Sequence, residues 1–102
     1  MSGSADKARF LRALAFEIRR KRPADEALTD CIEKEGRGGR HRVFRQALIV
    51  LQAEGFLAAL KSAGLVGEEA AGVLAAIMAE NDHRLLAGAL NGLAEYHEQQ
   101  PT

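Results

Sequence analysis

The sequence is poor in the residues that cross-link or rigidify small proteins. Its 102 residues include one cysteine, Cys31, two prolines and no tryptophan. A single cysteine cannot form an internal disulfide, which excludes a disulfide-rich secreted scaffold and suits a reduced, cytoplasmic setting. We therefore expect an apolar core to stabilise the fold, and a chain of this length is large enough to bury one.

Long apolar runs are also missing. A run such as ALIVL at residues 47–51 is far short of the about 20 residues that a membrane span needs. No apolar segment near the start resembles the core of a signal peptide. We expect a protein without a membrane span, with one domain over residues 5–100, and we treat residues 1–4 as a disordered or tag-derived start.

The chain as a whole has no net charge, but each of its halves does. The chain has 14 basic and 14 acidic residues, yet residues 1–51 hold 12 Lys and Arg against 7 Asp and Glu, and residues 52–102 hold 2 against 7. Two halves of opposite charge favour the steering of an acidic partner to one end of the molecule, or the head-to-tail association of copies. A zero total argues against a dedicated nucleic-acid binder.

The sequence does contain helical periodicity. No stretch alternates apolar and polar residues as a strand would, and apolar residues recur at spacings of three and four. Pro23, Gly55 and Gly64 interrupt the pattern. This predicts an all-α fold with helices over residues 6–21, 23–36, 41–54, 56–63 and 68–79, and a sixth from about residue 82.

The apolar stripes of the third, fifth and sixth segments predict much of the core. We expect residues 41–54 to form the most buried helix. The side chains that we place in the core from residue 43 onward are Val43, Phe44, Ala47, Leu48, Leu51, Val73, Leu74, Ile77, Met78, Leu85, Leu86, Ala89, Leu90, Leu93 and Tyr96. Gly88 and Gly92 lie four apart in the last segment, and each costs ~1 kcal/mol relative to alanine. Such a pair predicts a close helix crossing.

Four polar residues, Glu80, Asn81, Asp82 and His83, precede the last helix. Asn81 or Asp82 can accept hydrogen bonds from the free N–H groups of its first turn, and capping alone explains them. The alternative is a metal or acid–base site that includes His97, but His97 lies about four turns further along the helix. We expect no metal and no cofactor.

Catalytic residues are equally hard to find. Cys31 lies on the apolar stripe of its helix and has no histidine nearby in sequence, which indicates a buried small hydrophobe rather than a nucleophile. The glycine-rich turn GRGGR at residues 36–40 lacks the pattern of a phosphate-binding loop. The sequence predicts no catalytic residue, and therefore not an enzyme.

Basic residues are the best sign of a binding surface, with a solvated face as the alternative. They lie in two groups: Arg19, Arg20, Lys21 and Arg22, and Arg37, Arg40, Arg42 and Arg45. The groups converge only if the first and third helices are neighbours, and contact with phosphates of nucleic acid or lipid would then be possible. Aromatic residues for base stacking are scarce, which argues against RNA.

Two stretches resemble a known family. The residues that match its spacing are Phe10, Arg12, Leu14, Ala15, Pro23, Glu26, Ala27 and Leu28 near the start, and Leu86, Ala89, Leu90, Leu93, Ala94 and Tyr96 near the end. This pattern resembles the cytoplasmic helical domain of the inner-membrane platform protein of type II secretion and type IV pilus assembly, the secretion protein F family.

The resemblance implies a non-catalytic protein-interaction module at the cytoplasmic face of the inner membrane. It would pair with itself as a homodimer and contact an assembly ATPase and inner-membrane secretion components. With the periodicity, it predicts a six-helix antiparallel bundle of two three-helix halves. The expected contact residues are Arg12, Arg19, Arg20, Arg22, Glu80 and Asp82, although Arg12 equally suits an internal salt bridge.

Two other functions are kept as alternatives. The first is a small helical regulator that binds nucleic acid through the basic N-terminal half, for which affinity would fall steeply with salt. The second is a metal-dependent enzyme built on the polar turn at residues 80–83. Both need side chains to converge in a way that only the three-dimensional structure can show.

Overall fold

The computed structural model describes residues 4–35 and 41–99. Its elements are α1 (Ser4–Arg19), α2 (Ala24–Glu35), α3 (His41–Glu54), α4 (Phe56–Ser62), α5 (Glu68–Ala79) and α6 (His83–Glu98). The predicted all-α fold is confirmed, and the predicted helix ends agree to within about two residues. Residues 1–3 and the GRGGR turn at residues 36–40 lie outside the described residues.

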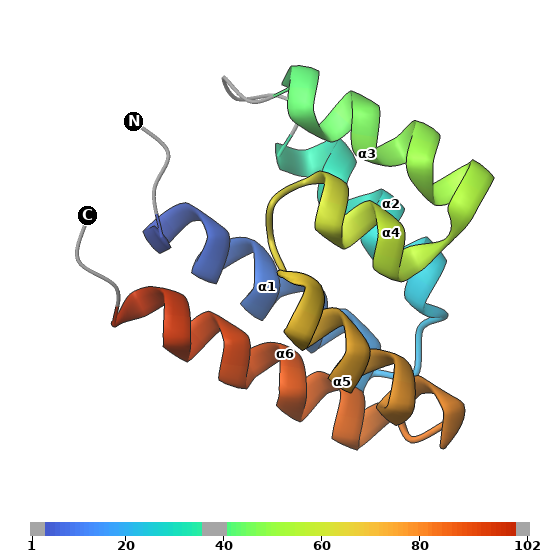
Figure 1. The fold of residues 1–102 in the computed structure, drawn as a ribbon, viewed down its shortest axis with the longest axis vertical. Coiled ribbons are helices and arrows are strands. Elements are labelled where there is room, and N and C mark those ends of the chain that lie inside the picture. The colour runs from blue at the N-terminus through green and yellow to red at the C-terminus, as the bar shows by residue number, and fades with distance from the viewer. Residues whose placement is uncertain (1–3, 36–40, 100–102) are drawn as a thin grey trace.

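The helices form two groups of three (Figure 1). In one group α6 packs against α1 and α5, and in the other α2, α3 and α4 pack against one another. The α1–α2 and α4–α5 contacts join the groups. The bundle thus has the two predicted halves, but α1 joins the two C-terminal helices instead of its neighbours in sequence. α1 and α6 run antiparallel and share the most extensive contact.

The core is centred on α1. Phe10, Leu11, Leu14 and Ile18 are among its fully buried side chains, and Leu90 of α6 is buried against it. The prediction that α3 is the most buried helix is wrong: only Phe44, Ala47 and Leu51 are buried among its described side chains. The reason is position, because α1 lies between α6 and the other half, whereas α3 lies at the edge of the bundle.

One aromatic pair joins the two halves. The rings of Phe10 on α1 and Phe44 on α3 stack with their centroids 5.1 Å apart and an interplanar angle of 11°. Both side chains are almost fully buried. The pair therefore fixes the start of α3 beside the start of α1, and it adds to the stability that the buried apolar area provides.

Local sequence explains where α1 ends. Lys21 adopts a left-handed backbone conformation, with φ of 69°. Its N–H donates to the carbonyl of Ile18 at 2.9 Å, and the N–H of Arg22 donates to the carbonyl of Glu17 at 3.3 Å. This pair of bonds is a Schellman motif, which satisfies carbonyls that the helix leaves free. Pro23 follows, and α2 begins at the next residue.

The predicted close crossing at Gly88 and Gly92 is wrong. Both glycines are exposed, and a Cβ atom added to either would meet no heavy atom within 4 Å. α6 instead contacts α1 through larger side chains such as Leu86 and Leu90. Packing therefore does not explain why these two helical positions are glycines. Among the described helices, none is long and apolar enough to cross a bilayer.

A candidate protein-binding groove between α5 and α6

The surface of α5 and α6 exposes apolar side chains that the sequence pattern assigns to the core. Val73 and Tyr96 are each 57% exposed and Leu85 is 48% exposed, while Ile77 and Leu93 are partly buried. The prediction that the first three are buried is wrong. α5 contacts only α4 and α6 in the described structure, so no further helix covers the outer part of its apolar stripe.

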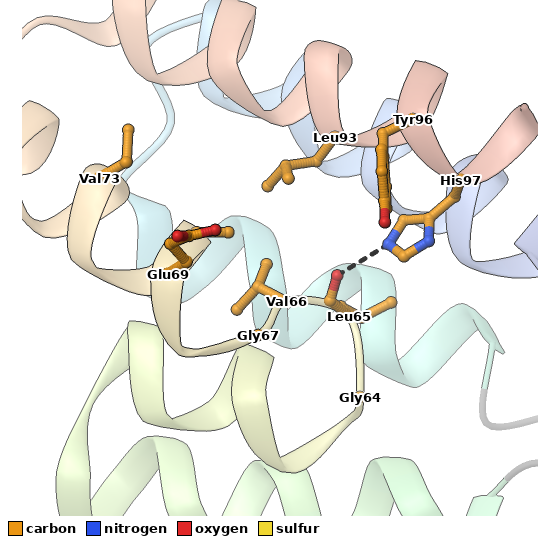
Figure 2. Close-up of a pocket in the computed structure, with 10 residues that line it drawn as sticks. Gly64, Leu65, Val66, Gly67, Glu69, Val73, Leu93, Tyr96 and His97 are labelled. Atoms are coloured by element: carbon orange, nitrogen blue, oxygen red, sulfur yellow. Dashed lines mark hydrogen bonds between the residues drawn. The ribbon is translucent and has the colours of Figure 1, made fainter. Parts of the chain in front are cut away.

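A groove runs along this surface. It consists of two adjoining hollows, of about 790 and about 300 Å³, which share Ala70, Val73 and Leu93. Figure 2 shows Leu93 and Tyr96 projecting from α6 toward Val66 on the opposite wall. We call this feature the α5–α6 groove, lined by Gly64, Leu65, Val66, Gly67, Glu69, Ala70, Val73, Leu74, Ala89, Gly92, Leu93, Tyr96 and His97.

A hydrogen bond ties the two walls together at one end. The imidazole Nε2 of His97 donates to the carbonyl of Leu65 across 3.0 Å, as the dashed line in Figure 2 marks. Leu65 follows Gly64, whose φ of 75° turns the chain out of α4. The N–H of Leu65 then donates to the carbonyl of Leu60 at 3.0 Å. The wall between α4 and α5 is therefore anchored to α6 before any ligand binds.

The groove is apolar with one acidic edge. Glu69 is its one acidic lining residue, no lysine or arginine lines it, and the smaller hollow is lined by apolar residues alone. Beside Glu69, the carboxylate of Glu68 accepts from Lys61 Nζ at 3.0 Å. A ligand that fits would present apolar side chains to the groove and a positive charge to Glu69.

The two groups of predicted basic residues do not converge. No Cα atoms of α1 and α3 lie within 8 Å of one another in the described structure. The Phe10–Phe44 stack places the start of α3 near the start of α1, whereas Arg19 lies about 14 Å further along α1. Arg37 and Arg40 lie outside the described residues. The described structure therefore offers no single basic face.

Two of the predicted contact residues are occupied within the chain. Arg22 Nη1 lies 2.6 Å from Asp30 Oδ2 and 3.3 Å from Glu17 Oε1, which joins the end of α1 to the middle of α2. Hydrogen bonds to Asp30 and then to Glu17 raise the pKa of Arg22 above its ordinary value. Arg12 pairs with Glu98 at 2.7 Å, so the structure shows the internal salt bridge that was its alternative role.

The remaining predicted contact residues lie at the end of α1 and around the turn before α6. Arg19 and Arg20 are exposed at the end of α1, and the Arg20 guanidinium carbon lies 5.3 Å from the centroid of the Phe16 ring. Glu80 is exposed after α5. Asp82 shares a small hollow of about 150 Å³ with Arg22. Contact of these six residues with a partner stays a prediction.

The polar turn before α6 is a helix cap. Asp82 Oδ1 accepts from the N–H of Leu85 at 3.0 Å, and Asn81 has a left-handed φ of 57°. The capping interpretation of Asp82 is confirmed. Within residues 4–35 and 41–99, no group of three or more His, Cys, Asp or Glu residues is placed to hold a metal ion. Cys31 is buried, at 5% exposure.

The groove was not among the sequence predictions, although one signal of it was present. The apolar stripes of α5 and α6 are wider than two packed helices need, since they include Val73, Leu85 and Tyr96. Comparison of the chain with protein-family models, curated proteins and solved structures gives no match. The resemblance to the platform proteins of secretion and pilus assembly therefore stays a prediction.

Proposed function

We propose that this chain is a non-catalytic protein-interaction module that binds an amphipathic helix of a partner protein in the α5–α6 groove. The observation that carries the proposal is an exposed apolar pair, Val73 and Tyr96, at a groove of about 790 Å³ with pre-anchored walls. Exposed apolar surface of this kind is typical of interaction sites, and helix-in-groove binding is a common recognition mode.

The groove defines the chemistry of the partner. Its apolar lining fits side chains spaced at i, i+3 or i+4 and i+7 on one helical face. Glu69 at its edge favours a lysine or arginine beside that stripe. From the family resemblance, we propose an assembly ATPase or an inner-membrane secretion component, met at the cytoplasmic face of the inner membrane, as the first partners to test.

The proposal of a non-catalytic role rests on what the reactive side chains do in the fold. Cys31 is buried, and the Asp82 carboxylate caps α6. His97 donates the hydrogen bond that anchors the groove wall. Each of these groups has a structural role that explains its position without any reaction chemistry.

A second copy of the chain is itself a suitable partner. Arg42, Arg45 and Ile49 lie at spacings of three and four along α3, and all three are exposed. That face carries the apolar and basic side chains that the groove favours. We therefore include self-association, with α3 of one copy in the groove of another, in the proposed function.

The experiment is a titration of ¹⁵N-labelled protein with a synthetic amphipathic helix whose leucine stripe is flanked by lysines. Shifted amides should cluster at residues 65–73 and 89–97. Val73→Glu should weaken binding by at least about tenfold, because it puts a charge into the apolar groove. Ile49→Glu is the matched control, since Ile49 is 56% exposed against 57% for Val73 and lies on α3.

Light scattering over a range of concentrations separates the two kinds of partner. Ile49→Glu should abolish self-association and leave peptide binding unchanged, whereas Val73→Glu should abolish both. Equal peptide affinity for the wild type and Val73→Glu, or shifted amides confined to the α1–α6 face, would disprove the groove as the binding site.

A further inference from the structure

A separate hollow lies between the end of α1 and the first half of α6. It has a volume of about 230 Å³ and is lined by Arg19, Arg84, Ala87, Gly88 and Asn91. Arg84, Gly88 and Asn91 follow one another at spacings of four and three, so they share one face of α6. Arg19 comes from α1 and completes the hollow. None of its lining residues belongs to the α5–α6 groove.

Two arginine residues line this hollow without a counter-charge. No carboxylate is among its lining residues, and neither Arg19 nor Arg84 forms an ion pair with any side chain that the structure describes. Arg12 and Arg22, in contrast, are held by carboxylates at 2.7 and 2.6 Å. Like charges that share a site repel, so a bound anion would relieve a repulsion that the described fold leaves uncompensated.

Arg84 lies close to the N-terminal end of α6. It is the second residue of α6, whose first turn contains no acidic residue. The N-terminal end of a helix carries a partial positive charge, which favours anions and disfavours a cation. The carboxylate of Asp82 caps this end of α6 and offsets the dipole, so the positive charge at the hollow comes from the two arginines.

Gly88 forms part of the lining and has no structural reason to be glycine. Its backbone is not in the left-handed region, and an added Cβ atom would meet no heavy atom within 4 Å. Alanine would be the more stable residue in a helix interior. The absence of a side chain does, however, leave that side of the hollow open, which suggests that the space itself has a use.

We propose that Arg19, Arg84 and Asn91 bind the phosphate group of a small phosphate monoester in this hollow. A phosphate dianion matches two guanidinium groups in charge, and its three terminal oxygens accept several hydrogen bonds at once. Arginine forks fit this geometry, and the Asn91 amide is a further donor. The hollow has a volume of about 230 Å³, which limits it to a small ligand and favours a monoester over an extended nucleic-acid backbone.

The test uses the whole chain and two probes, inorganic phosphate and phenyl phosphate, followed by ¹⁵N NMR at constant ionic strength. Both should shift the amides of Gly88 and Asn91, with millimolar affinity or better. Tighter binding of phenyl phosphate identifies an organic monoester as the source of the group, and tighter binding of inorganic phosphate identifies free phosphate. Dimethyl phosphate, a singly charged diester, should bind at least about tenfold more weakly.

Matched variants separate a built site from general positive charge. Arg19→Gln with Arg84→Gln should lower the affinity at least about tenfold, whereas Arg42→Gln with Arg45→Gln removes the same charge from α3 and should leave it unchanged. Gly88→Ala should raise the melting temperature yet weaken phosphate binding. Gly92→Ala, at an equally open glycine outside the hollow, should raise the melting temperature without that loss.

Three results would overturn the proposal. They are shifts that chloride reproduces at equal ionic strength, an equal loss of affinity in both arginine pairs, and unchanged binding in Gly88→Ala. A duplex DNA that binds more tightly than the monoesters and shifts the same amides would also overturn the proposal, in favour of the nucleic-acid alternative. Because peptide binding at the α5–α6 groove is measured separately, the proposed function is tested independently.

Discussion

Arg12 on α1 and Glu98, the last residue of α6, form a two-bond ion pair across 86 positions of sequence. Arg12 Nε donates to Glu98 Oε2 at 2.9 Å, and Nη2 donates to Oε1 at 2.7 Å. Two parallel bonds of this kind constrain orientation as well as distance. The pair therefore helps to set the register in which α1 and α6 run antiparallel, and this is the largest helix contact of the fold.

The Arg12–Glu98 pair predicts a pH dependence of stability. The hydrogen bond from Arg12 lowers the pKa of the Glu98 carboxyl below its ordinary value. A carboxyl whose pKa is lowered on folding stabilises the fold above its unfolded pKa and stops doing so as the pH falls through the folded pKa. Glu98→Gln should therefore lower the melting temperature slightly at pH 7, and the difference should vanish in acid.

Thermal unfolding of the two proteins between neutral and acidic pH measures this difference. Glu33→Gln is the control, because Glu33 is exposed on α2 and forms no ion pair among the described residues. A Glu98→Gln deficit that persists in acid would show that the side chain acts through packing and not through its charge.

Lys21 predicts a stabilising substitution. Its φ of 69° is a conformation that costs an L-residue roughly 1–2 kcal/mol and costs glycine far less. Lys21→Gly should raise the free energy of unfolding by about 1 kcal/mol, after allowance for the greater freedom of glycine in the unfolded chain. Urea denaturation measures it.

The control for Lys21→Gly is the same change at an ordinary helical position. Ala13 is exposed within α1, so Ala13→Gly should lower the free energy of unfolding by about 0.5–1 kcal/mol. If Lys21→Gly also lowered it, the Lys21 side chain would have to make a stabilising contact that outweighs its backbone strain.

The cap of α6 predicts that Asp82 stabilises the fold through its side-chain oxygen, which accepts a hydrogen bond, and not through its charge. Asp82→Ala removes the acceptor for the Leu85 N–H and should cost about 1 kcal/mol. Asp82→Asn should cost much less, because asparagine caps a helix about as well as aspartate. Chemical denaturation compares the two, with the exposed Glu80→Ala as a control. Equal losses in both Asp82 variants would point to a role for the charge itself.

The success and failure of the sequence predictions have different physical sources. Helix ends are local: Pro23 cannot continue α1, and Gly55 adopts a φ of 105° directly after α3. The apolar stripes correctly place Phe44, Leu74 and Leu90 in the core. They do so because a residue in the middle of a stripe is covered whichever neighbour packs against it.

The same apolar stripes do not predict the burial of residues at their edges. They also do not predict which helices far apart in sequence pack together. Val73 and Tyr96 belong to apolar faces, but periodicity does not show whether another helix covers the edge of a face. The pairing of α1 with α6 brings Arg12 to Glu98 and Arg19 to Arg84. No local pattern encodes that pairing. The Arg19–Arg84 hollow depends on that pairing, and the α5–α6 groove depends on an apolar face whose edge no helix covers. Neither site could therefore be derived from the sequence.

Gly92 predicts a conflict between stability and binding at the α5–α6 groove. It lines the smaller hollow, and an added Cβ atom would meet no heavy atom of the protein. Gly92→Ala should raise the free energy of unfolding by about 0.5–1 kcal/mol. The new methyl group would enter the groove and should weaken binding of the amphipathic peptide, because a partner helix there needs close approach.

Gly72 on α5 is the matched control for this prediction. It is exposed and equally open to a Cβ atom, but it does not line the groove. Gly72→Ala should therefore give the same gain in stability with peptide affinity unchanged. Equal peptide affinity in both variants would mean that the partner does not reach the floor of the groove at Gly92. Loss of affinity in Gly92→Ala alone would explain why a destabilising residue is present there, since binding needs the space that alanine would fill.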